Sequence, residues 1–399
     1  MPVLRVKEEK TLVKIVVALD SFKGSLTAVQ ACDVVAAAIR SSLPGAEVVT
    51  KPMADGGEGT AAVLMAAAGG QWIARTVMGP LPEMRVEAGF VWLAQDKTAV
   101  VEMATASGLT LLRTEQRNPL TTTTCGTGQL IQAAVDYGAY RVLLAIGGSA
   151  TVDGGVGAAT ALGWKFLTAQ GREIGLGGGQ LLSIDSIVPP EHAVGAAVEV
   201  LCDVDNPLCG EHGAAQVYGP QKGATPEMVE ALDAALAHLA KAVKNQLGRD
   251  IAELPGAGAA GGLAAGAVAF MNARLVSGIE TVMLQTRLEE ALAGADWVLT
   301  GEGCFDEQSL RGKVVSGVIH MAEAAARQSP TKPKVKVGVL AGQVRLSPGE
   351  YRRAGVEAVV SCMEDGMDLE YAIAHGERLL ARAAMRFVRG HVETKETYR

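Results

Sequence analysis

Three glycine-rich strings that carry acidic residues each follow a short run of apolar and β-branched residues. They are Asp20-Ser-Phe-Lys-Gly-Ser25, Ala54-Asp-Gly-Gly-Glu-Gly59 and Thr300-Gly-Glu-Gly303. We expect the runs before them, residues 14–19, 47–51 and 295–299, to form β-strands. Ligands of parallel α/β sheets bind at the carboxyl ends of the strands. The sequence therefore predicts an α/β fold in which the three strings gather at one edge of a sheet.

The alternation of strand and helix is interrupted in the middle of the chain. Residues 14–80 alternate strand, loop and helix, with helices expected at 27–42 and 60–68. Residues 84–93 and 98–103 instead flank a tight polar loop, as in a β-hairpin. Strand and helix alternate again after residue 295. We therefore expect two α/β domains, a discontinuous parallel one (residues 1–82 plus 286–399) and an inserted one (residues 83–285), with a ligand site in the cleft between them.

Composition excludes several classes of protein. A chain of 399 residues that is 49% hydrophobic has enough apolar material for two cores. The net charge of −7, without a cluster of basic residues, argues against nucleic acid as a partner. Six cysteines without metal-type spacing, and no signal peptide, favour reduced thiols in the cytoplasm. The uncharged stretch 255–273 is mostly alanine and glycine, so we interpret it as a buried helix and expect no membrane span.

The first and second strings each have the composition of a ligand site. Asp20, Ser21 and Lys23 precede a predicted helix, whose N-terminal N–H groups attract phosphate. An ordinary helix cap with a solvated Lys23 explains this string about as well. In the second string, Asp55 and Glu58 stand among glycines that let a ligand approach the backbone, which suits a magnesium phosphate or a polyhydroxyl substrate. A plain turn before a helix is the equally weighted alternative.

The other polar strings add the groups that a phosphate chemistry needs. Glu302 and Asp306 follow the third predicted strand, with Lys313 further on. Gly147, Gly148, Ser149, Ala150 and Thr151 follow an expected strand at 142–146 and precede a helix, which makes a cradle for an anion. Asp203, Asp205 and Asn206 end another apolar segment, and Lys222 lies in a glycine-rich loop. Taken singly, a turn at Asp205 and an ordinary loop lysine at Lys222 are the better explanations.

Several familiar sites are excluded. Gly256-Ala-Gly-Ala-Ala-Gly261 matches a dinucleotide motif in its letters but follows Pro255 instead of a strand. The chain has no Walker A loop and no Gly-x-Ser-x-Gly elbow. Its six histidines lack metal-binding spacing. The sequence therefore argues against a nicotinamide oxidoreductase, a serine hydrolase and a histidine metal centre.

Taken in order, six strings resemble the bacterial glycerate kinases of type 1, over about residues 14 to 385. They are the three strings above with Gly147-Gly-Ser-Ala-Thr-Val-Asp-Gly-Gly155, Cys202-Asp-Val-Asp-Asn-Pro-Leu208 and Gly219-Pro-Gln-Lys-Gly-Ala224. The resemblance implies ATP-dependent phosphorylation of D-glycerate to 2-phosphoglycerate and Rossmann-like and flavodoxin-like domains. Cys304-Phe305 departs from the expected pattern but leaves Glu302 and Asp306 in place.

Phosphoryl transfer needs a carboxylate at the acceptor hydroxyl, Mg²⁺ and cations around the phosphates, and we assign the residues on that basis. Asp203, with Asp205 beside it, is our candidate base, and Asp55 is the alternative. Lys23, the loop 147–151 and Lys222 are expected to hold phosphate or the substrate carboxylate. Glu302 and Asp306 are expected to hold Mg²⁺ through waters. The candidates for substrate binding are Asp20, Ser21, Asp55, Gly56, Gly57, Glu58 and Asn206.

Other functions stay open at this point. The nearest rivals are a kinase of another small sugar acid or polyol and a kinase that forms the 3-phosphate. A non-catalytic sugar-acid sensor on the same fold is a further alternative. We expect a monomer or homodimer.

Overall fold

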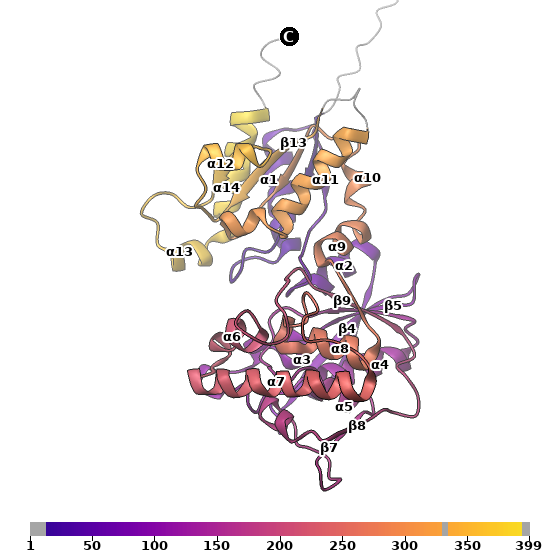
Figure 1. Cartoon of the computed structure of the whole chain (residues 1–399). Helices are drawn as coiled ribbons and strands as arrows, with labels where there is room; N and C mark the ends of the chain where they lie inside the picture. The colour runs from indigo at the N-terminus through magenta and orange to yellow at the C-terminus, as the bar shows by residue number, and fades with distance from the viewer. Residues whose placement is uncertain (1–12, 329–333, 393–399) are drawn as a thin grey trace, which may run out of the picture. The chain divides into compact units, whose positions relative to one another are not determined.

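The computed structural model describes residues 13–328 and 334–392. It is a mixed α/β structure that divides into two compact units, residues 1–53 with 286–399 and residues 54–285 (Figure 1). The predicted α/β class is confirmed. The predicted boundary at residue 82 differs from the one at residue 53, because residues 54–82 pack and pair within the second unit.

The first unit is built on a fully parallel sheet in the order β2-β1-β11-β13-β15. These strands are β1 (Lys14–Val17), β2 (Glu47–Thr50), β11 (Trp297–Thr300), β13 (Lys336–Ala341) and β15 (Val356–Ser361). A small parallel pair, β12 (Cys304–Phe305) and β14 (Gln343–Val344), accompanies it. The helices are α1 (Ala28–Ser42), α10 (Leu288–Leu292), α11 (Val314–Gln328), α12 (Pro348–Arg353), α13 (Leu369–Ala374) and α14 (Gly376–Phe387).

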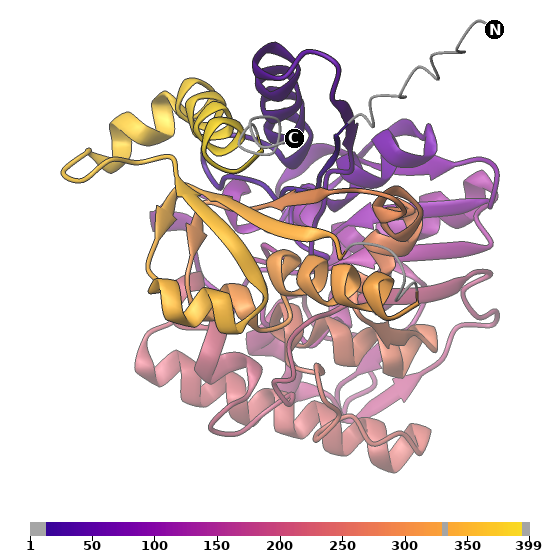
Figure 2. The ribbon, with the colours of Figure 1, turned by 90° about the horizontal axis from the view of Figure 1, so that it is seen from above.

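Helices cover both faces of this sheet. Figure 2 shows α1 and α14 on one face and α11 on the other. Ile15 and Val17 point into the core under α1 and α14, where Trp297 meets Phe387 edge to face at 5.0 Å between ring centroids. The N-terminus of α1 is fixed by a capping box between Thr27 and Gln30. Burial on both faces explains why these strands read as continuous apolar runs.

The second unit contains a mixed six-stranded sheet in the order β10-β9-β6-β5-β4-β3. Its strands are β3 (Gln71–Met78), β4 (Arg85–Leu93), β5 (Thr98–Glu102), β6 (Arg141–Ala145), β9 (Ala197–Leu201) and β10 (Arg274–Val276). Strands β5, β6, β9 and β10 run parallel, whereas β3, β4 and β5 pair antiparallel. The expected hairpin is therefore β4 and β5. A separate hairpin is formed by β7 (Lys165–Leu167) and β8 (Ser186–Val188).

The helices of this unit form layers. They are α2 (Thr60–Ala68), α3 (Ala104–Ser107), α4 (Cys125–Tyr137), α5 (Val156–Ala161), α6 (Ala214–Tyr218), α7 (Pro226–Leu247), α8 (Leu263–Met271) and α9 (Gly278–Gln285). Helices α4, α5 and α8 share one core with the sheet, and α7 packs outside them in a second core. Helix α8 is the buried helix expected within 255–273. Among residues 13–328 and 334–392, no helix is long and apolar enough to cross a bilayer.

A charged cluster ties three neighbouring strands of the second unit together. Glu199 of β9 is only 8% exposed and accepts hydrogen bonds from Arg141 of β6 (Nε, 3.0 Å) and Arg274 of β10 (Nη2, 2.7 Å). Burial raises the pKa of Glu199, but the two guanidinium groups outweigh it and hold the pKa below the ordinary value of 4.5. The carboxylate thus stabilises the fold in its ionised form.

We predict that Glu199→Gln lowers the free energy of unfolding at pH 7 by about 1–3 kcal/mol, because two charge-assisted hydrogen bonds become neutral ones. A carboxyl with a lowered pKa in the folded chain stabilises it above the unfolded pKa, and this contribution is lost as the pH falls. Urea unfolding should therefore show a weaker pH dependence below pH 4.5 in the variant. Asp250→Asn, which breaks an exposed pair with Lys244, is the control and should change stability less. Equal losses in both variants would contradict the prediction.

Candidate active site

The strand order of the first unit reverses between β1 and β11. The chain passes from β1 outward to β2, and after the second unit it returns to β11 on the other side of β1. When the five strands of this unit are numbered by their order along the chain, they lie in the order 2-1-3-4-5, as in flavodoxin-like sheets. Such sheets bind ligands at the carboxyl ends of the strands, where the order reverses. The strings that begin at Asp20 and at Thr300 follow β1 and β11, so both lie at this point.

The backbone brings these two strings together. The N–H of Asp20 donates to the carbonyl of Gly301 at 2.9 Å, and Gly303 lies against the backbone of Phe22 and Lys23. The cap of α1 is Thr27, and the side chain of Lys23 is exposed and outside the capping box. The structure thus keeps an exposed cation beside the carboxyl end of β11.

Glu302 of the third string and Asp306, which follows the string, lie on either side of Cys304 in the sequence. Burial raises the pKa of the Cys304 thiol, Arg345 opposes that effect, and the charges of Asp306 and Glu302 both raise the pKa further. Asp306 also begins a short 3₁₀ helix (Glu307–Leu310), where its Oδ1 accepts from the N–H of Gln308 at 2.9 Å. Both acids are half-buried, and Oε1 of Glu302 is itself shielded from solvent.

In the second unit, the Asp55–Gly59 string crosses the carboxyl ends of three strands. The N–H of Ala61 donates to Glu102 at the end of β5 (2.7 Å). A Cβ added at Gly147, just after β6, would lie 2.5 Å from the Cα of Gly57. A Cβ added at Gly56 would lie 2.9 Å from the Cβ of Leu201 in β9. The structure therefore brings the second string next to the 147–151 loop and the end of β9.

Asp203 follows β9 and is held in a fixed orientation. Its Oδ1 accepts from Ser277 Oγ (2.8 Å) and the N–H of Gly278 (3.0 Å), and its Oδ2 accepts from the N–H of Ile279 (3.0 Å). Asp203 thus caps α9. Burial raises the pKa of its carboxyl, and the negative charge of Asp55 adds to this effect. The three hydrogen bonds thus fix the orientation of this carboxylate.

The neighbours of Asp203 are placed differently. Asp205 is exposed. The side chain of Asn206 donates to the carbonyl of His212 (2.9 Å) and accepts from the hydroxyl of Tyr218 (2.7 Å). Asn206 is therefore occupied in holding its own loop. Glu58 is exposed, while Asp55 Oδ1 accepts from the N–H of Gly57 (3.2 Å).

Lys222 lies beneath the 147–151 loop instead of on its surface. It is 2% exposed, and its Nζ donates to Ser149 Oγ (2.6 Å) and to the carbonyl of Thr151 (2.8 Å). Burial lowers the pKa of Lys222 to about 7, and the charge of Asp153 opposes that shift. The lysine expected to meet a phosphate directly is thus a support of the loop.

Three polar residues of this site had no assigned role in the sequence. Asp153 is fully buried and accepts from Thr124 N (2.8 Å), Thr124 Oγ1 (2.9 Å) and the N–H of Gly155 (3.2 Å). Glu102 holds the start of α2, and Ser277 orients Asp203. The sequence does carry a signal for each of them. Asp153 stands beside Gly154 and Gly155, and Glu102 and Ser277 come at the ends of short apolar runs.

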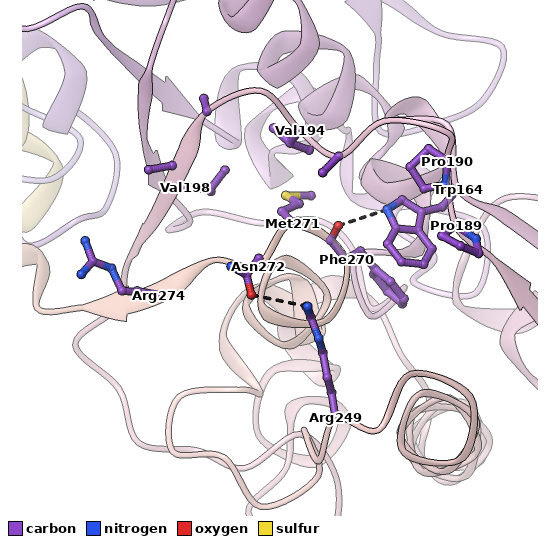
Figure 3. Close-up of a pocket in the computed structure, with 13 residues that line it drawn as sticks. Trp164, Pro189, Pro190, Val194, Val198, Arg249, Phe270, Met271, Asn272 and Arg274 are labelled. Carbon is purple, nitrogen blue, oxygen red and sulfur yellow. Dashed lines mark hydrogen bonds between the residues drawn. The ribbon is translucent and has the colours of Figure 1, made fainter.

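A pocket of about 460 Å³ in the same unit lies at the opposite ends of β9 and β10 (Figure 3). It is lined by Ala197 and Arg274, which begin these strands, and by the aromatic pair Trp164 and Phe270. Arg249 in its wall already donates to the carbonyls of Val268 (2.8 Å) and Ala269 (2.7 Å). This pocket is separate from the loops that carry the candidate site.

An α/β fold with acidic and glycine-rich loops at strand ends is that of an enzyme acting on small anionic molecules. Residues 15–391 match the model of the glycerate kinase family, and the chain belongs to this family. It is 44% identical to a glycerate kinase of Halalkalibacterium halodurans and 41% identical to the glycerate 2-kinase of Escherichia coli, each over 93% of this chain and 96% of the relative. A crystal structure provisionally described as glycerate kinase 2 of Salmonella typhimurium LT2 has a TM-score of 0.81 at 38% identity and covers 97% of this chain and 100% of that one.

The family membership expected from the six strings is thus confirmed. The protein is a phosphotransferase with an alcohol group as acceptor, and as a kinase it takes the phosphoryl group from ATP. The roles of individual site residues stay predictions.

We predict that Gly147→Ala lowers kcat/KM at least tenfold, because the new Cβ would displace the backbone of Gly57 and with it Asp55. Overpacking of this kind costs about 1–3 kcal/mol of stability, which urea unfolding measures. The control is Gly195→Ala, where the added Cβ would lie 3.4 Å from a methyl group of Val135 and the backbone φ is not positive. Unchanged kinetics in the Gly147 variant would show that the contact between the loops does not matter for activity.

Proposed function

We propose that this protein phosphorylates the 2-hydroxyl of D-glycerate with ATP and Mg²⁺. The observation that carries the proposal is the meeting of the Asp55–Gly59 string, the 147–151 loop and Asp203 at the carboxyl ends of β5, β6 and β9. The printed name of the Escherichia coli relative, glycerate 2-kinase, supports the choice of hydroxyl. Phosphoryl transfer requires a carboxylate held in a fixed orientation and a loop that binds the phosphates, and Asp203 and the 147–151 loop are our candidates for these parts.

Asp203 is our candidate for the group that accepts the proton of the acceptor hydroxyl. Its Oδ2 receives a single hydrogen bond, from Ile279, so an oxygen lone pair is left to face a substrate. Asp55 lies close enough for its charge to raise the pKa of Asp203, and it remains the alternative base. Asp205 is exposed and would act only in support. The proton leaves the hydroxyl as its oxygen attacks the γ-phosphorus, and ADP departs.

We assign the phosphates of ATP to the loop formed by Gly147, Gly148, Ser149, Ala150 and Thr151. Gly148 has a φ of +76°, a conformation that glycine adopts without strain, and it is exposed. We also assign the exposed Lys23 to phosphate, and Asp20 and Ser21 to the substrate. We assign Gly56, Gly57 and Glu58 to the substrate. Asn206 contributes indirectly, through the loop that it holds.

The donor set of the third string fits Mg²⁺. Within the described ranges, no three side chains of histidine, cysteine, aspartate or glutamate gather into a metal site of their own. Mg²⁺ in kinases, however, is bound through one or two carboxylates, waters and the phosphates of the nucleotide. Glu302 and Asp306 offer two such carboxylates near each other. Bound there, the ion would neutralise charge on the transferring phosphoryl group.

The remaining expectations concern partners and location. We propose a cytoplasmic enzyme that acts on small molecules without a nucleic-acid partner, as a monomer or homodimer. The acidic net charge of −7 supports the absence of a nucleic-acid partner. Analytical ultracentrifugation would decide between the two oligomeric states.

The proposed reaction is tested by ATP turnover with D-glycerate, L-glycerate, tartronate and glycerol, followed by phosphorus NMR of the product. Turnover confined to D-glycerate with a 2-phosphate resonance is the expected result. A 3-phosphate resonance or preference for another acceptor would replace the substrate assignment. Binding of D-glycerate without turnover by folded protein at saturating Mg²⁺ would favour the sensor alternative.

We predict that Asp203→Asn lowers kcat by at least about 100-fold, the usual cost of losing a general base. The amide cannot reproduce all the hydrogen bonds that the carboxylate accepts, so loss of the helix cap must be separated from loss of the base. Ser277→Ala removes one of these bonds and leaves the carboxylate, and it should lower kcat far less. Near-normal turnover of Asp203→Asn would remove the proposed role and turn attention to Asp55.

We predict that Glu302→Gln and Asp306→Asn each raise the Mg²⁺ concentration for half-maximal activity by about tenfold, because a neutral amide is a weaker ligand for a hard cation. Glu307→Gln is the matched control, since Glu307 is exposed and lies 3.9 Å from Arg311. Binding of Mn²⁺ to the ATP complex, followed by electron paramagnetic resonance, provides a second measurement. An identical Mg²⁺ requirement in all three variants would place the ion elsewhere.

A further inference from the structure

We propose that the buried Lys222 acts on the reaction through Ser149, by turning the hydroxyl hydrogen of Ser149 toward the phosphate of ATP. This inference rests on the proposed function of the 147–151 loop. Lys222 is then a positioning residue, and it gives the loop a positive charge without touching the ligand. Ser149 makes the contact.

The direction of the hydrogen bond follows from chemistry. Lys222 Nζ lies 2.6 Å from Ser149 Oγ. A charged ammonium group can only donate, so Ser149 Oγ must accept, and its own hydrogen is left for another acceptor. Ser149 is 8% exposed and stands next to the exposed Gly148, at the surface of the loop. An anion bound by the loop is the acceptor that this hydrogen requires.

The rest of the loop is fixed, so the hydroxyl is the part free to turn. The N–H of Ala150 donates to the carbonyl of Ser107 (2.9 Å), and the N–H of Leu109 donates to the carbonyl of Gly148 (2.8 Å). Lys222 itself holds the carbonyl of Thr151. A change at Lys222 therefore acts on Ser149 and on the carbonyl of Thr151, and a change at Ser149 alone isolates the first effect.

Both printed hydrogen bonds of Lys222 go to neutral groups, the hydroxyl of Ser149 and the carbonyl of Thr151. Among the described residues, Asp153 is the charged group whose field raises the pKa of Lys222. The hydrogen bonds of its carboxylate come from Thr123, Thr124, Gly155 and Gly157. On the other side, the backbone of Arg117 packs against Gly223. Burying a lysine without a close counter-ion is costly, and the cost is understandable if the charge serves a ligand.

The protonation of Lys222 would change what Ser149 does. Burial lowers the pKa of Lys222 to about 7. The neutral amine above this pH has a lone pair, to which the Ser149 hydroxyl can donate, and the hydrogen is then withdrawn from the ligand. Because the charged form binds the phosphate better, the affinity for ATP should fall as the pH rises through about 7.

The test measures the dissociation constant of ATP by calorimetry and the KM for ATP from pH 6.5 to 8.5. The wild type should lose affinity by about tenfold across this range, which is the worth of one charge-assisted hydrogen bond. Ser149→Ala and Lys222→Met should bind ATP about tenfold more weakly at pH 6.5, with a nearly flat profile above it and a smaller change in kcat. The phosphates of ATP also lose a proton near pH 6.5, and this affects all variants alike. The readout is therefore the difference in pH profile between each variant and the wild type.

Thr122→Val is the matched control. Thr122 Oγ1 donates to the carbonyl of Ala150 (2.8 Å), so this variant loosens the same loop without touching Lys222 or Ser149. It should keep the pH dependence of the wild type. Methionine replaces a buried charge by an apolar chain of similar length, which folded proteins often tolerate, and Ser149→Ala tests the idea independently.

The outcomes separate this inference from the proposed function. A pH profile in Ser149→Ala or in folded Lys222→Met that equals the wild-type profile would overturn the inference, whatever the turnover. If both variants flatten the profile for ATP while the wild type phosphorylates none of the four acceptors, the inference stands and the substrate assignment fails. Loss of the pH dependence in Thr122→Val would show a general effect of loop stability, and it would also overturn the inference.

Discussion

The arrangement of the second unit depends on the contact between two glycines. Gly57 and Gly147 come from loops that are about 90 residues apart in sequence, and there is no room for a side chain on Gly147. Because the backbones approach this closely, the acidic string lies over the ends of β5, β6 and β9 at once. A single methyl group at Gly147 would push these two loops apart.

Charges buried behind these loops give them rigidity. Glu102 holds the start of α2, Asp153 holds Thr124 and the turn before α5, and Lys222 holds Ser149 and Thr151. A buried charge without hydrogen bonds would destabilise the fold, whereas one that receives several fixes the groups around it. The burial that raises the pKa of both carboxyls and lowers that of the lysine is thus part of the same construction.

The sequence predicted those features that depend on local pattern. The α/β class, the hairpin 84–103 and the strands before the acidic strings follow from apolar runs and turn residues, and the structure has them. The expected boundary at residue 82 differs from the division at residue 53 because β3 pairs with β4, a tertiary contact that the strand pattern does not reveal. The burial of Lys222 was missed for a similar reason, since the 3₁₀ turn Pro220–Lys222 reads as a surface loop until the 147–151 loop is placed above it.

A buried lysine that acts on a ligand through a hydroxyl group has a chemical advantage in an enzyme that must release a phosphorylated product. A lysine in direct contact with phosphate forms an ion pair that strengthens as water leaves the site, and it holds product as firmly as substrate. A hydroxyl polarised by a buried ammonium instead offers a directed hydrogen bond of moderate strength, set by the geometry of Ser149. Lys23, for which we propose a phosphate-binding role, is exposed and has a long flexible chain, which suits a charge that moves during transfer. On this view, the two lysines that the sequence grouped together as phosphate-binding cations have different tasks, and burial is what distinguishes them.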